Sequence, residues 1–62
     1  MFAEGKKAYF VPSLWEESIA GKIVKVESYA GQVNYIILQT KDGTIIKDYA
    51  AKFTMKKPAV YR

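Results

Sequence analysis

The sequence predicts an all-β domain, and three observations lead to this fold class. Segments rich in β-branched and aromatic residues recur at short intervals, separated by glycine or proline. An Asp-Gly pair, Asp42-Gly43, lies between two apolar runs, which is typical of a β-hairpin because glycine adopts a positive φ at little cost. The chain has 62 residues, the size of one small domain. We therefore expect residues 1–62 to form a single domain of short strands.

The glycines and prolines set the boundaries of the expected elements. In chain order they are a strand at 6–11, a helical turn or structured loop at 13–18, a strand at 21–28, a turn at 29–32, strands at 33–40 and 44–48, a 3-10 turn at 49–52 and a short strand at 53–55 that resumes at 59–61. Pro12 ends the first strand, since proline has no N–H to donate to a sheet. Ser13 followed by Glu16 fits a capping box, so that residues 13–18 present Trp15 on a turn or loop.

The first two strands differ in how regularly their side chains alternate. In the first, Ala8 and Phe10 share one face. In the second, a regular alternation would place Lys22 and Lys25 on opposite faces, with Ile23 on the side of Lys25. The turn that follows is expected to hold Gly31 at a positive φ.

Two registers are open to the hairpin around Gly43. A two-residue turn would set Leu38 opposite Lys47, whereas a type I turn with Gly43 as a G1 bulge pairs Leu38 with Ile46. A slip of one residue moves every side chain to the other face of the sheet. Hydrophobic pairing therefore favours the bulged turn. For the last strand, Pro58 indicates a position at the edge of the sheet.

Five short strands in this arrangement resemble an SH3-like small barrel. The segments that carry the resemblance are Ala8-Tyr9-Phe10-Val11, Gly21-Lys22-Ile23-Val24-Lys25-Val26, Lys41-Asp42-Gly43 and Tyr49-Ala50-Ala51-Lys52-Phe53. The layout is also similar to KOW, Tudor and chromatin-type barrels and to short proteins encoded by phages and mobile elements. The acidic loop and aromatic signatures of signalling SH3 domains are missing, so the resemblance does not imply recognition of proline-rich peptides.

The composition argues against an enzyme. Without histidine or cysteine there is no catalytic triad of the usual kind, no thiolate nucleophile and no imidazole base. The common zinc and iron–sulfur ligand sets are missing as well, and we expect no cofactor. Glu16, Glu17 and Asp42 lie in expected turns, where carboxylates usually have structural roles. The four glycines are scattered and form no phosphate-binding loop.

Charge and aromatic content favour a binding module instead. The net charge is +4, with nine lysines and one arginine. Lysines 22, 25 and 47 fall on adjacent expected strands, and the bulged register makes Tyr35 and Tyr49 cross-strand neighbours. Lysines interleaved with tyrosines are typical of proteins that bind nucleic acid. Two other interpretations stay open: such a net charge is ordinary for a soluble domain, and a tyrosine pair also stabilises a sheet.

A protein-interaction module is the alternative function. Trp15 and an exposed strand edge would then bind an acidic host protein, as an inhibitor or adaptor of the phage type would, or a second copy of the chain. The size of the chain is compatible with a homodimer, because so short a chain buries little surface by itself. The first residues lack the apolar core of a signal peptide, and no apolar run approaches the length of a membrane span. We therefore expect a cytoplasmic protein without a membrane partner.

Overall fold

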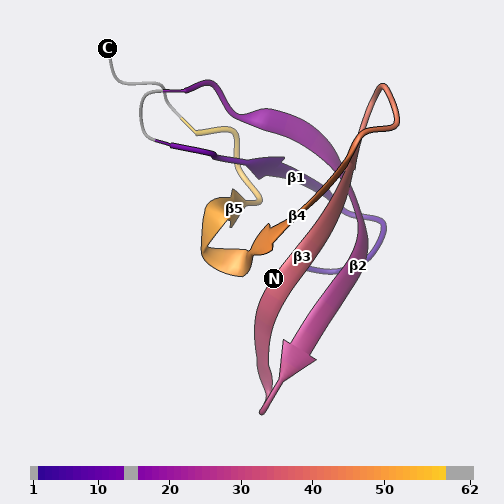
Figure 1. Cartoon of the computed structure of the whole chain (residues 1–62), viewed down its shortest axis with the longest axis vertical. Helices are drawn as coiled ribbons and strands as arrows, with labels where there is room; N and C mark the ends of the chain where they lie inside the picture. Colours follow the sequence, from indigo (N-terminus) through magenta and orange to yellow (C-terminus); the bar gives the residue numbers. More distant parts are fainter. Residues whose placement is uncertain (1, 14–15, 59–62) are drawn as a thin grey trace.

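The protein is a five-stranded antiparallel sheet that curls into a half-barrel (Figure 1). The structure is a computed structural model, and it describes residues 2–13 and 16–58. The elements are β1 (Lys7–Phe10), β2 (Ile19–Tyr29), β3 (Gln32–Thr40), β4 (Ile45–Tyr49), a 3-10 turn η1 (Ala50–Lys52) and β5 (Phe53–Thr54). The strand order is β4-β3-β2-β1-β5. The expected all-β class with one short 3-10 turn is confirmed.

Most expected boundaries lie within two residues of the observed ones. The main difference is β2, which begins at Ile19 and is 11 residues long. The capping-box segment contains no helix among its described residues; instead the Glu16 N–H donates to the Ser13 carbonyl at 3.4 Å, which closes a bend. Trp15 and the expected continuation of the last strand at 59–61 lie outside the described residues. No helix in the described part of the chain has the length and apolar character needed to cross a membrane.

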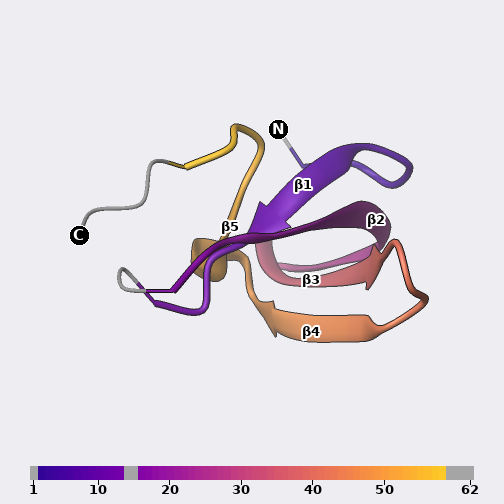
Figure 2. The same ribbon diagram turned by 90° about the horizontal axis from the view of Figure 1, so that it is seen from above.

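The length of β2 explains the curl of the sheet. Its first residues pair with β1, from Phe10 opposite Ile19 to Lys7 opposite Lys22. From Gly21 onward it pairs with β3, so one strand belongs to both halves of the sheet, and Figure 2 shows how the sheet bends around it. The concave side encloses the core. The buried side chains there are those of Ala8, Ile23, Ile36, Leu38 and Phe53.

The end of the chain closes against β1. The Val11 N–H donates to the Lys52 carbonyl at 2.7 Å, and the Lys52 ammonium donates to the Pro12 carbonyl at 3.2 Å. These contacts hold η1 beside the end of β1 and bring the Phe10 and Phe53 rings to 5.2 Å between centroids. The last strand therefore lies at an edge of the sheet, as expected, although it ends at Thr54, before Pro58.

The β3–β4 hairpin adopts the bulged register. Leu38 lies opposite Ile46, Gly43 has a φ of 91°, and its N–H donates to the Thr40 carbonyl at 3.0 Å. The Asp42 carboxylate accepts hydrogen bonds from the Thr40 hydroxyl and from the Thr44 N–H. These bonds, the one from Thr40 foremost, lower the pKa of Asp42 below its ordinary value. The choice between the two registers made on hydrophobic pairing is thus confirmed.

The β2–β3 hairpin turns on two residues, Ala30 and Gly31. Tyr29 pairs with Gln32 across the turn, and both central residues have positive φ, 54° for Ala30 and 79° for Gly31. This is the pattern of a type I′ turn, whose preferred sequence is Asn-Gly. Gly31 was expected in this conformation. Ala30 was not, because alanine is a poor residue for the left-handed region.

Replacing Ala30 by asparagine should therefore stabilise the protein. Left-handed backbone costs an ordinary residue about 1–2 kcal/mol, and asparagine tolerates it far better. We expect the unfolding free energy to rise by about 1 kcal/mol, which for a domain of this size raises Tm by roughly 4–8 °C. Thermal unfolding followed by far-ultraviolet circular dichroism measures this. Ala51→Asn is the matched control, since Ala51 is exposed and does not have a positive φ; an equal gain at both positions would contradict the explanation.

Candidate nucleic-acid interface

The candidate interface is the convex side of the sheet, opposite the core, along β2, β3 and β4. We call it the lysine–tyrosine face. Its residues are Lys22, Lys25 and Glu27 of β2, Tyr35, Ile37 and Gln39 of β3, and Ile45, Lys47 and Tyr49 of β4. They share one side because each is a cross-strand partner of another, and paired residues point to the same face of a sheet.

A bulge in β2 brings Lys22 and Lys25 to the same face. The register shifts between Ile23, which pairs with Leu38, and Lys25, which pairs with Ile37; Val24 is the extra residue. An inserted residue breaks the alternation of side chains. The expectation that the two lysines lie on opposite faces was therefore wrong, as was the placement of Ile23 with Lys25.

The face is organised as three cross-strand rows. The rows are Lys22–Gln39–Ile45, Lys25–Ile37–Lys47 and Glu27–Tyr35–Tyr49. Successive rows are two residues apart along each of β3 and β4, about 6–7 Å. All five strand residues expected to form a site thus lie on one surface, with two of the lysines on β2 and the tyrosines in the last row.

The two tyrosines in that row stack on each other. Their ring centroids lie 4.9 Å apart with an interplanar angle of 27°. Tyr35 is half-buried, whereas Tyr49 is 61% exposed. A hydrogen bond with the Tyr49 side chain, followed by the electrostatic influence of Tyr49, partial burial, and the charges of Glu27 and Asp48, raises the pKa of Tyr35 above its ordinary value. The Tyr35 phenol therefore stays neutral at physiological pH, as an ordinary tyrosine does. The exposed part of the Tyr49 ring is available to contact a ligand.

Lys47 is held between its neighbours. Its ammonium lies 3.3 Å from a Glu27 carboxylate oxygen and 5.4 Å from the centroid of the Tyr35 ring, within the range of a cation–π contact. Glu27 therefore offsets the charge of Lys47. The positive charge of the face is left mainly to Lys22 and Lys25, both exposed.

A hollow of about 330 Å³ opens beside the tyrosine pair. The residues that line it are Val33, Asn34, Tyr35, Tyr49, Ala50 and Ala51. It lies where β4 passes into η1, and it combines two aromatic rings with the amide of Asn34. A planar group that stacks on Tyr49 would therefore find a hydrogen-bonding side chain nearby.

Lys7 and Tyr9 of β1 also lie on the convex side and were not among the predicted site residues. Lys7 pairs with Lys22, and Tyr9 with Ala20, so that β1 extends the convex side beyond β2. The Lys7 ammonium lies 5.5 Å from the Tyr9 ring centroid. The signal was present in the sequence, since alternation places Lys7 and Tyr9 on the face opposite Ala8 and Phe10.

The side chains of the lysine–tyrosine face offer two kinds of contact to a ligand. Ammonium groups can contact phosphates, and phenol rings can stack on planar groups. Among the described residues, no cluster of carboxylates could hold a metal ion. Comparison with protein-family models, with curated proteins and with solved structures gave no match for this chain.

Proposed function

We propose that the protein is a non-enzymatic module that binds single-stranded nucleic acid through its lysine–tyrosine face. The observation that supports this most is the bulge at Val24. It turns Lys22 and Lys25 to the same side as Lys47, Tyr35 and Tyr49. Without a bulge, the same sequence would have divided the two β2 lysines between the surface and the core side.

The side chains favour single strands over duplexes. Base stacking on a protein ring requires unpaired bases, and the exposed ring of Tyr49 is available for it. The sequence has a single arginine, whereas direct readout of base pairs relies heavily on arginine. Binding with little sequence preference is therefore the expected mode.

The curled sheet is compatible with the SH3-like resemblance. Five antiparallel strands and a 3-10 turn before the last strand are what a small barrel of this kind contains. We therefore propose that the protein is a small barrel of the SH3-like class. Its similarity in layout to KOW and chromatin-type modules is the analogy that favours a nucleic-acid ligand. Analogy of fold alone does not assign a function, so the proposal depends on the side chains above.

Binding to fluorescein-labelled DNA and RNA 12-mers tests the proposal. Fluorescence anisotropy over a series of salt concentrations should show that affinity falls as salt rises. A plot of the logarithm of the association constant against the logarithm of the salt concentration should have a slope of about −0.7 for each phosphate contacted on a single strand. Duplexes of the same length should bind more weakly. Affinity for single strands that is independent of salt would contradict the proposed contacts.

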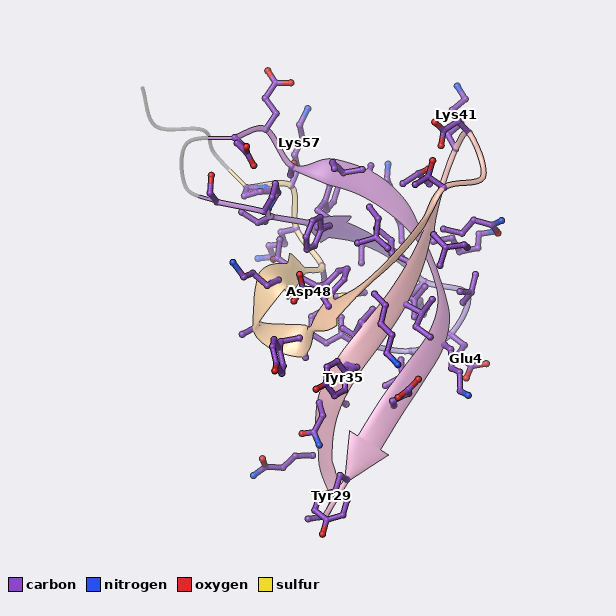
Figure 3. The ribbon with its side chains drawn as sticks, in the orientation of Figure 1. Glu4, Tyr29, Tyr35, Lys41, Asp48 and Lys57 are labelled. Atoms are coloured by element: carbon purple, nitrogen blue, oxygen red, sulfur yellow. The ribbon has the colours of Figure 1, made fainter. Side chains whose placement is uncertain are left out.

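Replacing Tyr49 by alanine should weaken this binding. Loss of one stacking ring costs about 1–3 kcal/mol, or roughly a 5- to 150-fold higher Kd. Tyr29→Ala is the matched control, because Tyr29 is 76% exposed near the tip of the β2–β3 hairpin and lies beyond the last row of the face, below Tyr35 in Figure 3. We expect the control to bind nearly as the original protein does, and equal losses in both variants would count against a defined stacking site.

The protein-interaction alternative has one supporting observation. β4 is an edge strand, and Ile45 on it is 56% exposed, so a strand of a partner protein or of a second copy could add to the sheet there. Stoichiometric binding of a protein, unaffected by salt or nuclease, would favour this alternative. Trp15, the other residue of that hypothesis, lies outside the described part of the chain.

A further inference from the structure

A second surface feature lies where β1, β2 and β3 meet. Lys7 and Lys22 are direct cross-strand partners on the convex side, and like charges in this position destabilise a sheet. A hollow of about 490 Å³ opens beside them, and Lys41 is the third lysine among the residues that line it. Three lysines therefore surround one depression, although the lysine–tyrosine face includes only Lys22.

The lining of this hollow contains no negative charge. Besides the three lysines, Ala20, Gln39 and the segments at Gly21 and Thr40 line it. The small side chain of Ala20 leaves the space open, and Gln39 supplies an amide donor. Asp42, the carboxylate nearest to Lys41 in the sequence, accepts hydrogen bonds from Thr40 and Thr44 within its own turn. Among the described residues, none of the three lysines has a carboxylate within ion-pair distance, in contrast to Lys47.

We propose that this hollow is a phosphate site and that, in the bound nucleic acid, it holds a backbone phosphate. The inference rests on the proposed function and gives the ligand a direction on the sheet. Gln39, at the hollow, and Tyr35, in the tyrosine pair, are four residues apart on β3, or about 13 Å. Figure 3 shows Lys41 and Tyr35 at different levels of the same hairpin.

The two ends of this path differ in charge. Glu27 pairs directly with Tyr35, and Glu27 and Asp48 both act on the Tyr35 phenol. Glu27 and Lys47 offset each other, so this end of the face has no excess positive charge to hold a phosphate, whereas a neutral base can still stack there. A bound single strand of nucleic acid therefore places one backbone phosphate in the hollow and one base on the Tyr49 ring.

The test compares variants at Lys7 and Lys41, which lie outside the lysine–tyrosine face, with a control of equal charge change. Lys7→Gln and Lys41→Gln should each raise the Kd for tripolyphosphate about tenfold, the usual scale for a charge-assisted hydrogen bond. Each should also weaken binding of the DNA 12-mer and lower its salt slope by about 0.7. Lys57→Gln is the control, since Lys57 is exposed beyond β5 and lies apart from Lys41 in Figure 3. Ala20→Glu, at an exposed position, fills the hollow with a carboxylate and should abolish tripolyphosphate binding.

Amide chemical shifts identify where tripolyphosphate binds and whether each variant is folded. Shifts confined to residue 7 and to residues 20–22 and 39–41 support the site. If the 12-mer binds and the hollow variants behave as Lys57→Gln does, the inference is overturned and the proposed function stands. If tripolyphosphate binds in the hollow and no 12-mer binds, the phosphate site is supported and the nucleic-acid function is overturned. Absence of binding to both ligands overturns both.

Discussion

Ile36→Ala is expected to cost the protein a large share of its folding stability. Ile36 is completely buried at the centre of the core, and truncating a buried isoleucine to alanine costs about 2–5 kcal/mol. Natural domains are stabilised by roughly 0.05–0.15 kcal/mol per residue, which gives a chain of 62 residues about 3–9 kcal/mol in total. At the middle of both ranges, the substitution therefore removes about half of the stability. Urea unfolding followed by circular dichroism measures the loss.

Ile45→Ala is the matched control for this loss. It removes the same atoms from a side chain that is 56% exposed on β4, and exposed substitutions usually change stability by about 0.5 kcal/mol or less. A loss at Ile45 as large as that at Ile36, and dependent on protein concentration, would show that a second copy covers the β4 edge.

Gly21→Ala is the second substitution with a large expected effect. A Cβ atom at Gly21 would lie 2.6 Å from the Gln39 carbonyl oxygen and 2.8 Å from the Leu38 Cγ. The backbone oxygen cannot rotate away as the end of a flexible side chain would, so β2 and β3 must separate where β2 bends. We expect a loss of about 3 kcal/mol, the upper part of the range for overpacking, measured by urea unfolding.

Gly43→Ala separates crowding from backbone strain. Gly43 has a φ of 91°, and a Cβ atom added there would meet no atom within 4 Å beyond its chain neighbours. Alanine at this position therefore costs only the strain of a left-handed residue, about 1–2 kcal/mol. Gly21→Ala should cost more and should also shift the amide resonances of β3. If the two variants lose the same stability and Gly21→Ala leaves β3 unshifted, the strands have room that the distances do not show.

The sequence was most informative where local chemistry decides the structure. The G1 bulge at Gly43 followed from the choice between Leu38–Ile46 and Leu38–Lys47 pairing, and the Tyr35–Tyr49 pair followed from that register. Glycine and the flanking apolar runs were sufficient because a hairpin turn involves few residues. The strand pattern of the whole domain was predictable for the same reason.

Features that depend on long-range pairing were not predictable in this way. The local sequence around Val24 is compatible with a regular strand and with a bulged one, and the two differ in which side chains face the core. Only pairing with β3 decides between these arrangements. The positive φ of Ala30 has the same origin, since the flanking strands impose it on a residue that does not prefer it. The hollow lined by Lys7, Lys22 and Lys41 requires β1, β2 and β3 together, so neither a single strand nor a single hairpin indicates it.

The bulge at Val24 has a consequence for how a gene for this protein can vary in length. Val24 is the residue without a partner on β3, so deleting its codon would leave Lys22, Ile23 and Lys25 in strict alternation, each on the face that it occupies now. Deleting a codon from the regular part of the same strand would instead turn the following side chains to the wrong face. Within β2, the bulge is therefore the place where evolution can remove one residue while keeping both lysines on the surface. An alignment of related sequences would record such a loss as a gap of one position.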